Sequence, residues 1–427
     1  MNIEELFDFE YIESGEYWSV THYYGRGEDV VFPESYKDIP VKTIGDWFSP
    51  YNKRIKRITI PEGYTSIGEQ AFEGCMLLKE INFPESLTSI GERAFKNCIL
   101  LTEIKLPKSL TSVGENAFSS CFMLKKIKLP EGLTSIWKYA FHNCPGLTDI
   151  KLPESLTSIG LGAFSYCKGL KDIKLPENLT SIDSCAFSDC TGLTNIKIPK
   201  SLTSISSDVF EGCTELAEIN VDENNPVFCS VDGVMFDKAM TTLICFPEGK
   251  KGKYSVPDGI ISIGRGAFFH KCKLTGISFT QSFLFNSYGF HGEHLTDFTV
   301  NELNPKYCSV DGVLFNKDKS KLISYPENKD RTDYTVPDGV IIIDTIAFLR
   351  CKHLINIVLP VSLKIIQDNA FLGCKELKII TLPMNLQYIG QGAFEFCPNL
   401  ETITLSRKTK IVYEAFKGFN GKLVYMD

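Results

Sequence analysis

The chain contains no long apolar run and no surplus of basic charge. None of its apolar stretches reaches the roughly 18 residues that a membrane-spanning helix needs, so we expect no membrane insertion. Its 45 Lys and Arg residues are outnumbered by 52 Asp and Glu residues, which gives a formal net charge of -7. Such a chain has no general positive field for holding nucleic acid, and we therefore expect no nucleic-acid partner.

An export signal is also missing from the first residues. The segment MNIEELFDFEYIESGEYW has neither the basic start nor the apolar core of a secretory leader. We expect a cytoplasmic protein if Met1 is the natural start. A trimmed sequence could instead lack its leader, and both alternatives stay open.

Motifs of catalysis and cofactor binding are absent as well. GLGAF, GRGAF and GQGAF hold two glycines of a dinucleotide loop but lack the third, and there is no G-x-S-x-G nucleophile motif. His291 and His294, with His270 one unit earlier, lack the H-E-x-x-H spacing of a helical zinc site. We interpret them as surface-loop residues and expect no catalytic residue, no metal and no cofactor.

What the chain does contain is a repeat of 23 residues. LTEIKLPKSLTSVGENAFSSCFM (101–123) is followed in the same register by LKKIKLPEGLTSIWKYAFHNCPG (124–146) and LTDIKLPESLTSIGLGAFSYCKG (147–169). Ten phenylalanines occupy the same position of this 23-residue repeat. They are Phe72, Phe95, Phe118, Phe141, Phe164, Phe187, Phe210, Phe348, Phe371 and Phe394.

The pattern within one unit is that of a short strand, not of a helix. In EIKLP, Ile104 and Leu106 alternate with Glu103 and Lys105, and Pro107 ends the strand by removing a ladder donor. A second extended piece (LTSV) and a glycine turn follow. One unit cannot bury its single apolar edge, so neighbours must stack at about 4.8 Å. We predict a β-rich solenoid of about 14 rungs, with short turns or 3-10 segments on the side away from the ladder strands.

The unit L-x-x-I-x-L-P-x-x-L-T-S-I-G-x-x-A-F-x-x-C resembles the leucine-rich repeats of the BspA-like type from about Thr43 to the end. The resemblance implies a leucine-rich-repeat right-handed superhelix. It also implies a non-catalytic binding scaffold at the cell surface or secreted, similar to bacterial and protozoan surface proteins. Several of these act as adhesins towards host matrix proteins or other microbes.

Four stretches depart from the repeat. Residues 1–42 are rich in strand formers, so we predict an N-terminal β cap, followed by the solenoid over 43–427. Two similar hairpin modules interrupt the solenoid at 222–257 and 301–337. Each has an Asp-Gly pair between β-rich runs, which is a strong hairpin signal. The pairs are Asp232-Gly233 and Asp311-Gly312. An irregular unit lies between the modules, where Phe283, Phe285 and Tyr288 form either repacked core or an exposed patch.

Eleven of the 15 cysteines follow the anchor position by three or four residues. A small thiol fits the inner corner of a stacked turn, where its S–H can donate weakly to a carbonyl of the neighbouring rung. We therefore expect reduced thiols. The eleven are Cys75, Cys98, Cys121, Cys144, Cys167, Cys190, Cys213, Cys272, Cys351, Cys374 and Cys397.

The outward positions of the predicted ladder carry two columns of charge. We name as the charged strip Glu103, Lys105, Lys128, Asp149, Lys151, Asp172, Lys174 and Lys197. The strip is either a solvated face whose opposite charges offset one another or a docking surface for a protein or an anionic glycan.

Three functions remain for comparison. The first is a cell-surface, adhesin-like scaffold that binds host or microbial proteins or glycans, and it is favoured by the resemblance. The second is a cytoplasmic protein-protein interaction scaffold, which the missing leader favours. The third is an enzyme around His270, His291 and His294, which would require a bound metal. We expect the first, acting as a monomer.

Overall fold

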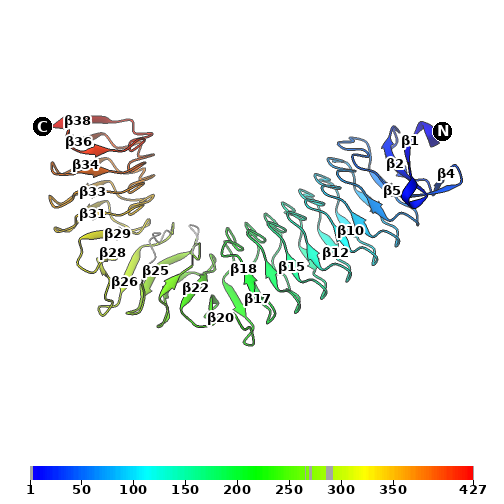
Figure 1. The fold of residues 1–427 in the computed structure, drawn as a ribbon. Coiled ribbons are helices and arrows are strands. Elements are labelled where there is room, and N and C mark those ends of the chain that lie inside the picture. Colours follow the sequence, from blue (N-terminus) through cyan, green and yellow to red (C-terminus); the bar gives the residue numbers. More distant parts are fainter. Residues whose placement is uncertain (1–2, 265, 269–271, 285–291, 427) are drawn as a thin grey trace. The chain divides into compact units, whose positions relative to one another are not determined.

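The computed structural model describes residues 3–264, 266–268, 272–284 and 292–426. These residues form stacked coils, each of which contributes short parallel strands (Figure 1). They make about 17 coils, whereas the sequence analysis predicted about 14 such rungs. The difference arises because residues before Thr43 and the hairpin modules also supply strands to the ladders. The chain divides into two compact units, Met1–Lys238 (unit 1) and Ala239–Asp427 (unit 2).

Each unit has two ladders of strands. Strands at the EIKLP position form the first ladder, and strands at the LTSI position form the second. In unit 1 the first ladder consists of β3 (Asp29–Val31), β6 (Arg57–Thr59), β8 (Glu80–Asn82), β10 (Glu103–Lys105), β12 (Lys126–Lys128), β14 (Asp149–Lys151), β17 (Asn195–Ile198) and β19 (Glu218–Val221). The second consists of β5 (Ile39–Ile44), β7 (Ser66–Ile67), β9 (Ser89–Ile90), β11 (Ser112–Val113), β13 (Ser135–Ile136), β15 (Ser158–Ile159), β16 (Ser181–Ile182) and β18 (Ser204–Ile205).

The N-terminal residues pair with the second ladder. β1 (Phe7–Ile12) and β2 (Tyr17–Tyr23) are antiparallel, and β2 pairs in parallel with β5. β4 (Ser35–Tyr36) adds a short antiparallel pair to β5. Two single-turn 3-10 helices, η1 (Ile3–Glu5) and η2 (Glu13–Gly15), flank β1. The open edge of β5 is therefore covered, which removes a site for edge-to-edge association.

Unit 2 repeats the arrangement. Its first ladder consists of β23 (Gly252–Ser255), β25 (Leu274–Phe279) and β26 (Asp297–Val300), and then β30 (Asp333–Thr335), β32 (Asn356–Val358), β34 (Ile379–Thr381), β36 (Thr402–Ser406) and β38 (Lys422–Met426). Its second consists of β22 (Thr242–Cys245) and β24 (Ser262–Ile263), and then β29 (Lys321–Ser324), β31 (Ile342–Ile343), β33 (Ile365–Ile366), β35 (Tyr388–Ile389) and β37 (Lys410–Ile411).

The predicted hairpins are confirmed. β20 (Phe228–Val231) and β21 (Val234–Asp237) are antiparallel in unit 1, as are β27 (Tyr307–Val310) and β28 (Val313–Asn316) in unit 2. Asp232 and Gly233 turn the first hairpin with φ of 50° and 71°, as a two-residue turn with both φ values positive requires. The Gly233 carbonyl accepts a hydrogen bond of 2.8 Å from the Ile219 N–H, which ties the turn to β19.

The anchor phenylalanines form a stack inside the coils. The rings of Phe95 and Phe118 are parallel within 4°, with centroids 5.5 Å apart, and both side chains are fully buried. The alternation in the first ladder is also confirmed, because Ile104 is buried while Glu103 and Lys105 are exposed. In the irregular repeat between the two hairpin modules, Phe283 is buried against Phe279. It therefore belongs to the core. Phe285 and Tyr288 lie outside the described residues.

A buried asparagine in each module escaped the sequence analysis. The Nδ2 of Asn225 donates to the carbonyls of Pro199 and Leu202, while its Oδ1 accepts from the N–H groups of Val227 and Phe228. All four bonds are 2.8 to 2.9 Å long. Asn304 makes the corresponding four bonds in the second module. The Asn-Pro pair that the modules share was the available signal.

Candidate functional site

The charged strip lies on the first ladder of unit 1. Glu103 and Lys105 belong to β10, Lys128 to β12, and Asp149 and Lys151 to β14. Each of these side chains is exposed, because the strands alternate and the isoleucine between the charged positions points inward.

Parallel in-register pairing brings part of the lysine column together. Lys105 pairs with Lys128, and Lys128 pairs with Lys151, so these three share one column at the inter-strand spacing of about 4.8 Å. Asp172 and Lys174 fall on a segment with no strand assignment, and Lys197 lies on the next strand, β17. The repeat predicts one column of the five strip lysines. The structure pairs Lys105, Lys128 and Lys151 on neighbouring strands, while Lys174 and Lys197 are not paired with them.

The lysines of the strip differ in their partners. Lys174 lies 3.8 Å from Glu154, and Lys197 lies 3.5 Å from Asp222. Within the part of the chain that the structure describes, Lys105, Lys128 and Lys151 form no ion pair. Like charges in one exposed column repel one another, and exposed ion pairs contribute only about 0 to 1 kcal/mol. These three ammonium groups are thus available to an external anion without breaking an internal contact.

The cysteine ladder is packed as predicted. Cys121 Sγ donates to the carbonyl of Phe95 at 3.3 Å, and Cys144 Sγ makes the same contact with Phe118 at 3.2 Å. Burial raises the pKa of the Cys144 thiol to about 12. A thiol with so high a pKa is protonated at neutral pH and is a poor nucleophile, so this column stabilises packing instead of supplying reactivity.

The histidines do not form a describable site. His270 and His291 lie outside the described residues. His294 lies 3.4 Å from the carboxylate of Glu293 and is almost half exposed. Within the residues that the structure places, no three His, Cys, Asp or Glu side chains gather closely enough to hold a metal ion.

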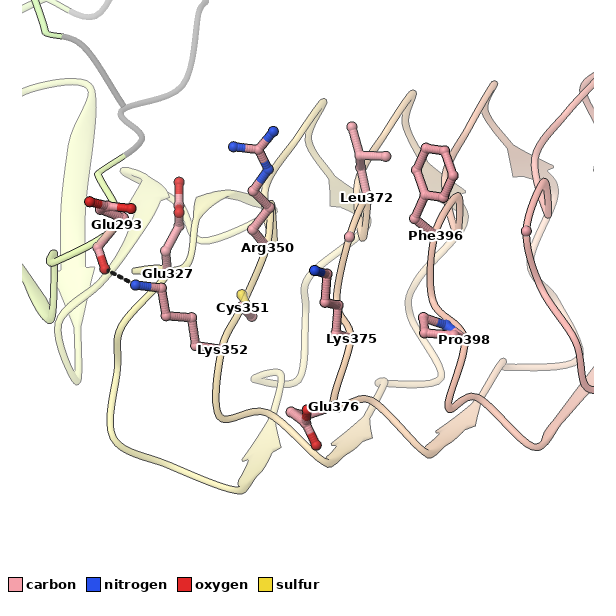
Figure 2. A pocket seen from close by; sticks show the side chains of 12 residues that line it. Glu293, Glu327, Arg350, Cys351, Lys352, Leu372, Lys375, Glu376, Phe396 and Pro398 are labelled. Carbon is pink, nitrogen blue, oxygen red and sulfur yellow. Dashed lines mark hydrogen bonds between the residues drawn. The ribbon is translucent and has the colours of Figure 1, made fainter. Parts of the chain in front are cut away.

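A pocket of about 780 Å³ opens on the turn side of unit 2 (Figure 2). Figure 2 shows Arg350, Leu372 and Phe396 in a row along successive coils, and a Cβ at Gly373 would lie 3.1 Å from the Arg350 Cγ. The Lys352 Nζ donates to the backbone carbonyl of Glu293 at 2.6 Å. The lining combines three cations with three carboxylates, and its one thiol, Cys351, is buried. This mixture of charges pairs no nucleophile with a base, so it supports no particular reaction.

The repeat region matches a known family. The model of the BspA type leucine rich repeat region, which spans six copies, matches residues 42–170, 134–252, 243–333 and 325–426. The chain belongs to this family. BspA type leucine-rich repeats are in general binding scaffolds, and the stacked coils agree with that architecture. A comparison with curated proteins found no match.

Several solved bacterial leucine-rich repeat proteins are similar to this BspA type chain. One from T. pallidum has 29% identity, covers 45% of this chain and 90% of its own, and has a TM-score of 0.44. A leucine-rich cell surface protein from Faecalibacterium prausnitzii has 23% identity, covers 99% of this chain and 93% of its own, and has a TM-score of 0.45. One from Bacteroides ovatus has 24% identity, covers all of both chains, and has a TM-score of 0.48.

No helix in the described residues has the length and apolar character needed to cross a bilayer. The helical segments described are the two single turns at the N-terminus.

Proposed function

We propose that this protein is a cell-surface, adhesin-like scaffold that docks a host or microbial protein onto the charged strip of unit 1. The observation that carries the proposal is the column of Lys105, Lys128 and Lys151, three in-register cations that form no ion pair with any residue the structure describes. An acidic patch on a partner would relieve their mutual repulsion.

The neighbouring column favours a folded protein over a uniform polyanion. Glu103 and Asp149 lie beside the lysine column at the other outward position of the same strands. Lys126 of β12 stands between these carboxylates, 3.4 Å from Asp149, so a uniform polyanion would match the charge at only one of the three positions. A protein surface can place its own cations opposite them, which gives complementary charge and a defined register.

The surface location is supported by the family and by the relative from F. prausnitzii that is described as a cell surface protein. The alternative is a cytoplasmic interaction scaffold. Protease treatment of intact cells separates the two, because a surface protein is cleaved while the membrane still protects cytoplasmic markers. Protection of the protein in intact cells would contradict the surface role.

Charge reversal tests the docking surface. A variant with Lys128→Glu, Lys151→Glu and Lys174→Glu should keep its fold and lose binding to purified matrix proteins in surface plasmon resonance. Exposed substitutions change stability little, whereas like charges across an interface cost several kcal/mol.

A control with the same change in net charge places the substitutions on turns. Lys108→Glu, Lys168→Glu and Lys200→Glu alter exposed lysines outside the first ladder. The control should bind as the unmodified protein does, with an association rate that falls as salt rises. Equal binding by both triple variants would remove the strip as the docking surface.

A further inference from the structure

An exposed tryptophan interrupts the second ladder of unit 1. Trp137 follows β13 at a position where most coils carry glycine, and 49% of its surface is exposed. The adjacent coils have Gly114 and Gly160 at this position. A Cβ at Gly114 would lie 2.5 Å from the Glu92 amide nitrogen, which explains why the repeat favours glycine there. Trp137 therefore places a large apolar ring where the coil geometry disfavours any side chain.

The glycines on both sides add no cover to the half-exposed indole. Neither Gly114 nor Gly160 has a side chain that can stack on it. Among the described residues no aromatic ring and no cation packs on Trp137. An exposed indole costs free energy in water, since burying it would remove a large apolar area. A ligand with an apolar face would recover that free energy.

A groove of about 510 Å³ extends from Trp137 across four coils of the second ladder. This volume lies within the range of small-molecule and oligomer sites. Its lining includes one serine from each of β13, β15, β16 and β18, held in register by parallel pairing. The serines are Ser135, Ser158, Ser181 and Ser204. At about 4.8 Å per step, the four hydroxyls span roughly 14 Å.

These hydroxyls are not used by the fold. The threonines beside them bond between coils, as when Thr157 Oγ1 donates to the Thr134 carbonyl at 3.0 Å. In contrast, none of the four serine Oγ atoms has a hydrogen-bond partner in the part of the chain that the structure describes. Each hydroxyl can donate one hydrogen bond and accept two, so the groove offers an evenly spaced row of neutral donors and acceptors.

Charge in the groove is balanced except for one carboxylate. Lys138 lies 3.4 Å from Glu115 and is thereby paired. Asp183, two coils beyond Trp137 at the same repeat position, has an exposed carboxylate that also accepts from the Ser184 N–H at 2.7 Å. The groove therefore presents no unpaired cation to hold a phosphate or sulfate, and Asp183 would repel such a group.

We propose that this groove binds a neutral, extended β-linked oligosaccharide. The C–H face of one pyranose ring lies against the negative face of the Trp137 indole. The following rings, each about as long as one coil is thick, exchange hydrogen bonds with the serine row. Asp183, on the third of the four coils, accepts from sugar hydroxyls. This site goes beyond the proposed function, because it lies on a different ladder from the charged strip and takes a ligand of different chemistry.

Calorimetric titration with cellopentaose and with N-acetylchitopentaose tests the site on the full chain. At least one of these neutral pentasaccharides should bind, while β-1,4-linked pentamannuronate, an anionic counterpart with the same linkage, should not. Trp137→Gly restores the residue of the adjacent coils and should therefore keep the melting temperature. It should weaken binding on the order of tenfold, as the loss of one aromatic contact implies. Trp137→Tyr should recover most of the affinity.

A matched control uses the other strongly exposed tryptophan of unit 1. Trp47 is 48% exposed and lies outside the groove, with a positive φ that asparagine tolerates. Trp47→Asn should leave oligosaccharide binding unchanged. The combination of Ser158→Ala and Ser181→Ala should reduce affinity severalfold without changing the fold.

Three results would overturn the proposal. They are no heat from either neutral pentasaccharide at millimolar concentration, equal binding by the Trp137→Gly variant, and preference for the anionic sugar. Loss of protein-ligand binding in Trp137→Gly, with no oligosaccharide bound, would assign the groove to a protein contact instead. The charged-strip triple variant should retain oligosaccharide binding, so failure of one proposal is distinguishable from failure of the other.

Discussion

The two units of the chain have similar interiors and different outer faces. On the first ladder of unit 1 the outward positions of β10, β12 and β14 carry Lys105, Lys128 and Lys151. The equivalent positions in unit 2 carry uncharged side chains. These are Val358 on β32, Thr381 on β34 and Thr404 on β36. The exposed Ile379 on β34 makes this face still more apolar.

The interiors show no such divergence. Phe118 and Phe141 stack with centroids 5.7 Å apart in unit 1, and Phe371 and Phe394 do so at 5.1 Å in unit 2. The stack restricts what an inward position can hold, because every coil must present the same shape to its neighbours. Outward positions contact solvent and exposed side chains of neighbouring coils, as in the ion pair of Lys126 with Asp149, so they can differ between the two units without disturbing the interior.

The largest effect should come from the shared interior. Phe141→Ala and Phe371→Ala should each lower the free energy of unfolding by about 3 to 5 kcal/mol, since each removes a fully buried ring between two others. Urea denaturation followed by circular dichroism measures the loss. Similar costs in both units would support matched interiors, and a negligible cost in one would break the comparison there.

The buried asparagines should come next. Asn225→Ala and Asn304→Ala each leave two carbonyls and two N–H groups without their partner, so we expect a loss on the order of 3 kcal/mol. Thermal unfolding measures it. Asn224→Ala, which changes an exposed neighbour, is the control and should have little effect. A melting temperature unchanged by Asn225→Ala would mean that water replaces the amide.

The buried thiols predict an alkaline loss of stability in both units. Burial raises the pKa of Cys144 in unit 1 and of Cys245 in unit 2 to about 12, from a starting value of 9.0. The folded state therefore holds a proton that the unfolded state releases. This stability is fully present below about pH 9 and is lost as pH rises towards 12, at about 1.4 kcal/mol per pH unit for each thiol.

Substitution isolates each thiol from the other groups that titrate at alkaline pH. Cys144→Ala and Cys245→Ala should each reduce the slope of unfolding free energy against pH between 9 and 12. The measurement is a series of urea denaturations across that range. An unchanged slope in either variant would show that the thiol ionises in the folded state.

The smallest effect should come from the outer faces. Replacing Val358, Thr381 and Thr404 with Lys copies the unit 1 column onto unit 2, and should cost a few tenths of a kcal/mol per neighbouring pair. The cost should shrink when the salt concentration is raised from roughly 0.01 M to 1 M, because exposed charges are screened. Melting temperatures at both concentrations measure it. A cost that salt does not change would point to altered packing instead of repulsion.

Much of the fold was predictable, because the repeat expresses inward and outward positions directly. Phe118, Cys121 and Ile104 occupy positions that recur every 23 residues, and stacking gives each recurrence the same surroundings. The Asp-Gly turns were predictable for a local reason, since two adjacent residues with positive φ form the hairpin.

Residues outside the periodic pattern were not predictable. The sequence around Asn225 is typical of a loop. The four backbone groups that it bonds come together only when the module folds onto the preceding coils. Lys174 matches the repeat but lies outside the assigned strands. The charged strip was located from the sequence, yet which of its lysines lack an ion pair depends on carboxylates in other coils.

The sequence by itself determined that the chain stacks, which side chains point inward and which family it belongs to, because a 23-residue period repeats one local environment many times. Only the tertiary structure decided which exposed groups have partners. The serine hydroxyls beside Trp137 and the lysines of β10, β12 and β14 resemble their neighbours along the chain. They differ in the contacts made between coils, and those contacts exist only once the coils are stacked.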